Sequence, residues 1–303
     1  MLNLDSFSEL CRETGAQIAL SEPMSAHTTF RVGGPCAALV TVPDIPALQA
    51  IVRNLTRGGI PFRLIGRGSN LLVPDEGYPG VVLLLGGTFA GEIVREGDSL
   101  ICGAGTPLKN LCLAALNHGL TGMEFAYGIP GSAGGAVYMN AGAYGPEMKD
   151  VLLSVTAMDP DGSVREIPAS ALQLSYRHSV FMEQPGIVLR VTVELTAGDP
   201  EAIRARMQEL LGRRQEKQPL EFPSAGSTFK RPVGAYASQL IDECGLKGYR
   251  VGGAQVSEKH AGFVVNRGGA TFADIMAVCR HVQETVRAQT GFSLELEPEI
   301  MRV

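Results

Sequence analysis

The stretch "GIPGSAGGAVYMNAGAYG", residues 128–145, is built almost entirely from small residues. It holds six glycines and four alanines, so its backbone can turn sharply and lie close to another group. A second small-residue loop, "GRGSNLL" at 66–72, directly follows the apolar run "FRLI" at 62–65. Successive main-chain amides in such loops can bind phosphate oxygens, and two loops together can bracket a diphosphate. Taken singly, each loop is more often a tight turn, and the residues alone leave both interpretations open.

The common phosphate-binding motifs are missing from the sequence. The chain contains no Gly-Lys dipeptide, which excludes a Walker-type loop. The segments "GRGSNL" at 66–71 and "GAGTPL" at 103–108 begin as G-x-G but lack the third glycine of the dinucleotide fingerprint. A ligand at these loops would therefore be held outside a P-loop or a Rossmann fold.

The composition is that of a globular protein without a general affinity for polyanions. The chain has 303 residues, of which 45% are hydrophobic and 19% are charged, and its formal net charge is -5. This size predicts two or three domains, and the charge gives no attraction for nucleic acid or anionic lipid. We find no export signal and no apolar run near the ~20 residues that span a bilayer. We expect a cytoplasmic protein that binds no nucleic acid and has no membrane span.

The cysteines indicate a reduced compartment and no metal site. They lie far apart, with no C-x-x-C pair and no histidine at metal-ligand spacing. Their positions are 11, 36, 102, 112, 244 and 279.

Helical and extended segments alternate along the chain. Amphipathic helices are predicted at 44–59, at 106–119, after Pro200 and at 271–289. In the helix at 106–119, Thr106 is the expected N-cap and Pro107 the first helical residue. The helix at 271–289 is expected to begin with a capping box of Thr271 and Asp274. Short β-branched or aliphatic runs predict strands between them, and Asp161-Gly162 predicts a hairpin. The residues from about 200 onward can close a core of their own.

An ordered set of motifs resembles the UDP-N-acetylenolpyruvoylglucosamine reductase family. The first half carries "TTFRVGGP" at 28–35, "GRGSNLLV" at 66–73 and the stretch at 128–145; the second half carries "YRHSVF", "KQPLEFPSAGSTFKRP", "LIDECGLKGYRVGGAQVSEKHAGFVVN" and "LEPEI". The resemblance implies an α+β fold. An FAD-binding domain of the vanillyl-alcohol-oxidase-like (PCMH) type is expected over 1–198, in two lobes of about 1–85 and 86–198, and a C-terminal substrate-binding domain over 199–303.

The resemblance also implies an activity and its partners. The family converts UDP-N-acetylenolpyruvoylglucosamine to UDP-N-acetylmuramate for peptidoglycan, with NADPH as hydride donor and non-covalent FAD. His27 is then an ordinary loop residue rather than a flavin tether. We expect a monomer or a weak homo-oligomer, and the shorter family type, which lacks a tyrosine-bearing lid loop.

By the resemblance, the two small-residue loops hold the FAD diphosphate and lie along the flavin. A side chain at Gly131, Gly134 or Gly142 is expected to occupy the cofactor's place or to forbid the turn. Asn70 and Asn140 are expected to offer side-chain amides to the cofactor, with local Asx turns as the alternative. The expected cofactor-binding residues are Gly66, Arg67, Gly68, Ser69, Asn70, Leu71, Gly128, Ile129, Pro130, Gly131, Ser132, Gly134, Gly135, Asn140, Ala141 and Gly142.

Three residues match the chemistry of enol ether reduction. The substrate carboxylate gains charge as an enolate, which calls for a cation, and carbon then needs a proton. Arg177 fits the first task because its guanidinium matches a carboxylate, and Ser227 fits the second. In protonated form, Glu299 would donate to the enolate; the residues alone leave Glu297 open as well, and the family pattern selects Glu299.

Three further residues are expected to meet the substrate. Lys217 and Arg231 are candidate contacts for its diphosphate, and Tyr144 for the substrate and nicotinamide side of the flavin. His260 and Gln239 lie in family segments without a predicted role.

Two other classes of function stay open from the residues. One is an FAD-dependent oxidase or dehydrogenase of another small molecule on the same fold, and the other is a non-enzymatic nucleotide-binding or scaffolding protein. The segments "GSTFK" and "LEPEI" argue against both, because a mere flavin binder does not need them.

Overall fold

The structure, a computed structural model, describes residues 4–302, which form two compact units. The first unit consists of residues up to Leu20, Ala38–Arg67 and Gly80–Gly212. The second consists of Ser21–Ala37, Gly68–Pro79 and the chain from Arg213 onward. Both units are discontinuous in sequence, and the boundary near 198 stays a prediction.

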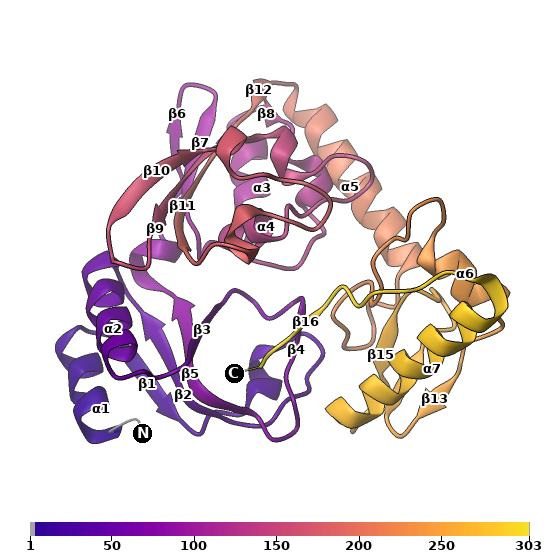
Figure 1. Cartoon of the computed structure of the whole chain (residues 1–303). Helices are drawn as coiled ribbons and strands as arrows, with labels where there is room; N and C mark the ends of the chain where they lie inside the picture. The colour runs from indigo at the N-terminus through magenta and orange to yellow at the C-terminus, as the bar shows by residue number, and fades with distance from the viewer. Residues whose placement is uncertain (1–3, 303) are drawn as a thin grey trace. The chain divides into compact units, whose positions relative to one another are not determined.

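The first unit begins with a four-stranded sheet covered by two helices (Figure 1). Helices α1 and α2 bury Phe7, Leu48, Ile51 and Leu55 against strand residues such as Val81. As predicted, Asp44 caps α2, and its Oδ1 accepts a hydrogen bond from Ala47 N at 2.9 Å. In sheet order, the strands are β1 (Gln17–Leu20), β2 (Cys36–Val42), β5 (Tyr78–Leu85) and β3 (Phe62–Ile65), and the helices are α1 (Leu4–Glu13) and α2 (Ile45–Arg57).

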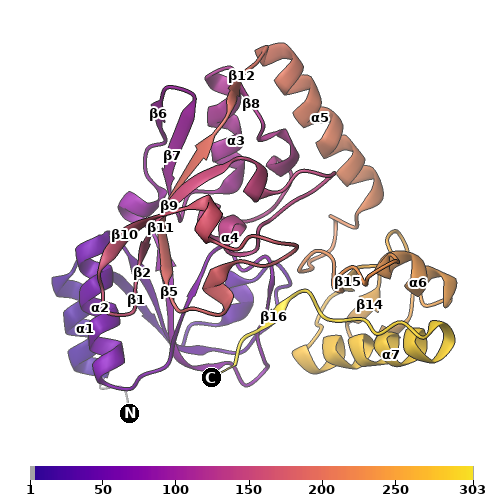
Figure 2. The ribbon, with the colours of Figure 1, turned by 45° about the horizontal axis from the view of Figure 1, so that its top comes forward.

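A five-stranded antiparallel sheet forms the rest of the first unit (Figure 2). Helices α3 and α4 pack on it through a core that includes Leu111, Val137 and Val191. The predicted Asp161-Gly162 hairpin joins β9 and β10. The strands are β10 (Val164–Pro168), β9 (Leu152–Met158), β11 (Ile187–Glu194), β7 (Ser99–Gly103) and β6 (Val94–Glu96), and the helices are α3 (Leu108–Asn117) and α4 (Ala133–Tyr138).

The predicted charged helix is α5 (Pro200–Lys217), whose Ile203 and Met207 join this core. The boundary between the units falls within it, after Gly212. A two-stranded sheet pairs β12 (Thr196–Ala197) with β8 (Leu120–Thr121). The 3-10 helices of the chain are η1 (Met24–His27), η2 (Gly87–Ala90), η3 (Glu124–Ala126), η4 (Met148–Asp150), η5 (Ala169–Ala171) and η6 (Val180–Met182).

In the second unit, α7 lies against a three-stranded sheet (Figure 1). All three stretches of the unit contribute to one core, which contains Phe30, Leu72 and Val282. The N-terminus of α7 has the predicted capping box of Thr271 and Asp274, and Asp75 Oδ1 also accepts from Phe272 N at 2.8 Å. The elements are α6 (Ala237–Glu243), β13 (Arg250–Val251), β14 (Ala254–Val256), β15 (Val264–Asn266), α7 (Phe272–Thr290) and the parallel pair β4 (Leu71–Leu72) and β16 (Glu299–Ile300).

The predicted helices and strands are present, with one wrong detail. Thr106 does not cap α3, because Pro107 takes the N-cap position and no side chain caps this end. The Thr106 hydroxyl is buried in the loop before α3 instead. Among residues 4–302, no helix is long and apolar enough to cross a membrane.

Candidate active site

The two small-residue loops meet in the first unit. Gly66 follows β3, and a Cβ atom added to it would lie 2.5 Å from Ser132 Oγ. Ser132 is buried as the N-cap of α4, and its Oγ accepts from Gly135 N at 3.3 Å. The two loops are therefore in contact at Gly66, and that they act together on a ligand stays a prediction.

This contact leaves main-chain donors available. The amides of Gly66, Arg67, Gly131 and Ser132 donate to no acceptor within the part of the chain that the structure describes. The neighbouring amides of Ala133 and Gly134 are engaged instead, since they donate to Thr106 O and Ala104 O at 2.8 Å each. Loop amides without protein acceptors are the donors that hold phosphate oxygens, so the residues present fit an anionic diphosphate.

The structure gives a different reason for two glycines. A Cβ on Gly134 would lie 2.7 Å from Ala104 Cβ, and one on Gly142 would lie 2.6 Å from Glu147 Cγ. Neither has a positive φ. The close approach of protein to protein therefore already requires glycine at these two positions, and their expected role toward the cofactor stays a prediction.

Asn140 also has a different task from the one expected. Its side chain is fully buried, and both of its N–H bonds point to protein acceptors, Glu147 Oε2 and Ser175 O, each at 2.9 Å. Its Oδ1 accepts from Lys149 N at 2.9 Å. Because an amide nitrogen has two protons, Asn140 Nδ2 has none left to donate to a cofactor.

Arg177 lies in a tight turn of the first unit. Ser175 and His178 exchange main-chain hydrogen bonds of 3.2 and 3.1 Å across the turn. Arg177 has a φ of +54°, which is uncommon for a residue with a side chain. Its Nη2 lies 3.5 Å from Gly142 O, and its guanidinium carbon lies 5.2 Å from the Tyr176 ring centroid. The predicted arginine is thus beside the second small-residue loop.

Asn70 and Glu299 are bonded to each other in the second unit. Glu299 N donates to Asn70 O at 2.9 Å, and Asn70 Nδ2 donates to Glu297 O at 3.1 Å. These bonds align β16 with β4, which lie side by side in Figure 1. The Glu299 side chain belongs to an exposed residue, as a residue that meets a substrate must be before binding.

Ser227 directly precedes two residues that bond to the chain just before β16. Thr228 O accepts from Glu297 N at 3.0 Å, and Phe229 pairs with Leu296 in an antiparallel bridge. Asn70, Ser227 and Glu299 all belong to the second unit, while Arg177 belongs to the first.

The remaining predicted contacts lie at exposed positions. Lys217 is the last residue of α5, and the Arg231 guanidinium lies 4.6 Å from the Tyr236 ring centroid. Tyr144 has a φ of +60° and is 41% exposed. Of the other predicted cofactor contacts, Leu71 begins β4, Gly128, Ile129 and Pro130 precede α4, and Ala141 follows it.

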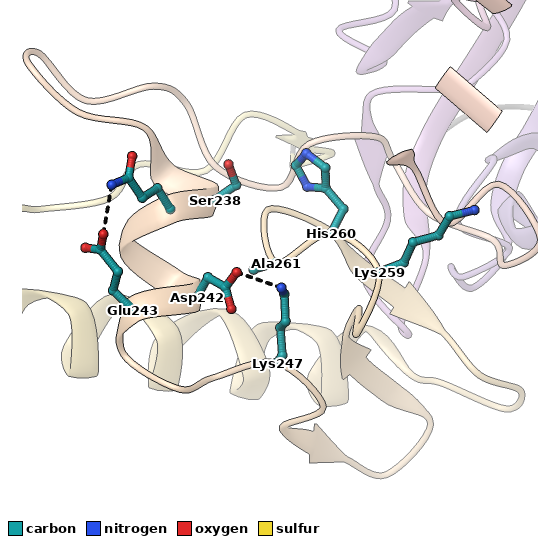
Figure 3. A pocket seen from close by; sticks show the side chains of 8 residues that line it. Ser238, Asp242, Glu243, Lys247, Lys259, His260 and Ala261 are labelled. Carbon is teal, nitrogen blue, oxygen red and sulfur yellow. Dashed lines mark hydrogen bonds and ion pairs between the residues drawn. The ribbon is translucent and has the colours of Figure 1, made fainter. Parts of the chain in front are cut away.

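A pocket of about 450 Å³ opens beside α6 in the second unit (Figure 3). Lys247 Nζ lies 2.6 Å from Asp242 Oδ2 across it. His260 and Gln239, which had no predicted role, both line this pocket. Burial lowers the pKa of the His260 imidazole below its ordinary value.

Comparison with known proteins decides the family. A reductase from Caldanaerobacter subterraneus, named UDP-N-acetylenolpyruvoylglucosamine reductase, is 45% identical over 297 residues, which are 98% of this chain and 96% of its own. One of the same name from Clostridium beijerinckii is 47% identical over 97% of this chain and 95% of its own. The chain belongs to the UDP-N-acetylenolpyruvoylglucosamine reductase family.

Family domains and a solved structure agree with this assignment. Residues 36–168 match the FAD binding domain, and residues 218–301 match the C-terminal domain of UDP-N-acetylenolpyruvoylglucosamine reductase. A crystal structure of the reductase from Thermus caldophilus has a TM-score of 0.81 and 39% identity, and the match covers 95% of this chain and 99% of that one. The predicted fold class, an α+β FAD-binding domain of the PCMH type with a C-terminal α+β domain, is confirmed.

Sequence reasoning missed the residues that hold the reductase's predicted site residues in place. These are Glu147, Ser175, Ser179 and Thr228, of which Ser179 and Thr228 are buried. Their only signal in the sequence is position: each lies within a few residues of a predicted site residue. Polar residues at such places are more often surface turns, so the spacing alone does not select them.

Proposed function

We propose that the chain is an FAD-dependent reductase that converts UDP-N-acetylenolpyruvoylglucosamine to UDP-N-acetylmuramate in peptidoglycan precursor synthesis. One observation carries the proposal: two small-residue loops meet at Gly66 and Ser132 with amides that have no acceptor within residues 4–302. This arrangement suits the diphosphate of non-covalent FAD, to which the main chain of segments 66–71 and 128–142 is proposed to bind. The relatives' shared name supplies the substrate.

Bound FAD would supply hydride transfer, with NADPH as the proposed source of the hydride. The protein's own residues are proposed to stabilise the negative charge that develops on the substrate and to deliver a proton to its carbon. Arg177 is proposed to bind the substrate carboxylate, where negative charge develops, because its planar guanidinium donates two parallel hydrogen bonds to a carboxylate. Its place beside Gly142 O, in the second small-residue loop, supports this role.

Ser227 is proposed to deliver the proton to carbon. A hydroxyl is a weak acid, but an enolate carbon is basic enough to accept its proton when the two are in contact. Glu299, in protonated form, is proposed to donate a hydrogen bond to the enolate. The pairing of the Ser227 segment with the segment that precedes Glu299 supports a shared site for these two residues.

Lys217 and Arg231 are proposed to bind the diphosphate of the UDP-sugar, and Tyr144 to contact the substrate. The compact β13–β15 sheet supports the shorter family type without a lid loop. The enzyme is proposed to be cytoplasmic and monomeric or weakly self-associating.

Replacing Ser227 with alanine separates the two halves of the reaction. In anaerobic stopped flow, flavin reduction by NADPH should stay within about twofold of the unsubstituted enzyme. Reoxidation of the reduced flavin by the enolpyruvyl sugar nucleotide should slow by about 10²-fold or more, the usual contribution of a positioned acid. Ser224→Ala, in the same loop, is the control for loop disturbance. Equal slowing of both half-reactions, or rapid reoxidation by oxygen with none by the sugar nucleotide, would contradict the proposed function.

A further inference from the structure

A buried polar network joins the second small-residue loop to the turn that carries Arg177. Asn140 lies at its centre with 0% exposure and a φ of +40°. It donates to Glu147 Oε2 and to Ser175 O, and it accepts from Lys149 N, each at 2.9 Å. Both N–H bonds and the oxygen of this amide are therefore used, and they connect residue 140 to the 147–149 segment and to Ser175.

The network allows only one orientation of the Asn140 amide. Lys149 N faces Oδ1, and two acceptors face Nδ2. Rotating the amide by half a turn would set its oxygen against the Glu147 carboxylate and the Ser175 carbonyl, and its nitrogen against the Lys149 N–H. Buried polar groups left without partners are strongly unfavourable, so the donor toward Ser175 is fixed.

Ser175 O belongs to the turn from Ser175 to His178. Arg177 within this turn has a φ of +54°, a conformation that persists only where the surroundings enforce it. A second anchor follows the turn, since Ser179 Oγ donates to Tyr138 O at 2.7 Å and Ser179 is fully buried. Both ends of the turn are thus bonded to the segment 138–140.

We propose that Asn140 is a positioning residue for the reaction, which holds the Ser175–His178 turn so that Arg177 meets the substrate carboxylate. This inference rests on the role proposed for Arg177. Asn140 itself touches neither substrate nor cofactor through its side-chain nitrogen. Its contribution is to orient Arg177, which is proposed to bind the substrate carboxylate, and small errors of orientation have large effects on the reaction rate.

A double substitution tests the inference by removing the bond to Ser175 while keeping the bonds to residues 147 and 149. In Asn140→Asp with Glu147→Gln, the glutamine Nε2 donates to the new carboxylate, so the pair stays bonded in the reverse sense. Aspartate has no proton for Ser175 O, so the anchor of the turn is lost. Glu147→Gln alone keeps the bond from Asn140 to Ser175 and serves as the baseline.

Relative to Glu147→Gln, the double variant should reoxidise with the enolpyruvyl sugar nucleotide about 10- to 100-fold more slowly. Flavin reduction by NADPH should differ by less than about twofold. In an Arg177→Ala background, the added substitution at Asn140 should cause no further slowing, because its effect acts through Arg177. Equal reoxidation rates in the double variant and the baseline, or a fully additive effect with Arg177→Ala, would overturn the proposal.

A second measurement keeps the inference separate from the proposed function. Hydrogen exchange at the Ser175 and His178 amides should accelerate at least about tenfold in the double variant relative to the baseline, because both amides bond across the turn. Should the unsubstituted holoenzyme fail to react with the sugar nucleotide, the proposed function fails. Unchanged exchange at those amides would then overturn the positioning role independently of any activity.

Discussion

In the first unit, the turn that carries Arg177 is anchored by side chains, whereas in the second unit the strand that carries Glu299 is anchored by the main chain. The turn is bonded through the Asn140 amide and the Ser179 hydroxyl. The strand is bonded through Glu299 N to Asn70 O and Met301 N to Leu72 O, both at 2.9 Å. A side-chain anchor depends on the identity of one residue. A main-chain anchor depends on backbone conformation, so the two regions should respond to different substitutions.

The largest expected effect is a backbone one, from Gly68→Ala in the second unit. Gly68 has a φ of +61°, and an added Cβ would overlap the carbonyl oxygen of His27. We expect a loss of more than about 3 kcal/mol in the free energy of unfolding, from strain plus overlap. Gly59→Ala is the matched control, since its φ is +60° with nothing within 4 Å of the added atom. It should lose only about 1 kcal/mol. If urea unfolding shows the same loss of unfolding free energy in both variants, overlap with the His27 carbonyl does not explain the effect of Gly68→Ala.

Next in size is Ser179→Ala, which tests the side-chain anchors of the Arg177 turn. The change removes the buried hydroxyl that donates to Tyr138 O, a loss of about 2 kcal/mol in the free energy of unfolding. Ser163→Ala removes an exposed hydroxyl of the β9–β10 hairpin and should change stability by less than about 0.5 kcal/mol. If thermal and urea unfolding show no difference between the two variants, the hydroxyl of Ser179 is not an anchor.

Asn70→Ala should have a smaller effect on stability, although Asn70 also lies at a predicted site. The substitution removes the side-chain bond to Glu297 O but keeps the main-chain bond from Glu299 N. We expect a loss of about 1 kcal/mol at a fixed FAD concentration. A loss larger than that of Ser179→Ala would mean that the strand, like the turn, is held by a side chain.

The smallest expected effect is that of Lys149→Met. The ion pair with Glu147 at 2.9 Å raises the pKa of Lys149, but the ammonium is exposed to solvent. Asn140 bonds to the main-chain N–H of residue 149, which any residue retains there. Thermal unfolding at low and at high salt should match the unsubstituted protein in each case. A drop as large as that of Ser179→Ala would show that the lysine side chain supports the network.

The elements of the fold were accessible from the sequence because local signals determine them. Asp44 and the Thr271–Asp274 pair cap helices where the residue pattern predicts caps. The prediction for Thr106 is wrong because a side chain can cap a helix only from the N-cap position. In this protein Pro107, one residue later, is the N-cap residue of α3. Such a shift depends on the loop at 103–106 packing against Gly134, which no local pattern reports.

The candidate site was accessible only in part. Family motifs point to Arg177, Ser227 and Glu299, but the residues that hold them come from distant segments. Asn140 reaches Ser175 across 35 positions, and Asn70 reaches Glu297 across 227. The expectation that small residues leave room for a cofactor comes from the sequence, whereas the structure shows that Gly134 and Gly142 also lie against other parts of the chain. The positions of glycines in the sequence cannot distinguish room for a cofactor from close contact with another part of the chain.

The parallel pairing of β4 with β16 has a consequence for biosynthesis. Asn70 leaves the ribosome 227 residues before Glu297, which at ordinary rates of translation means roughly 10 to 45 s. For that interval β4 lacks its partner strand β16, and the apolar side chain of Leu72 has no finished core to enter. Nascent chains stalled before residue 299 should therefore present this segment to chaperones and proteases, and completion of translation should end that exposure.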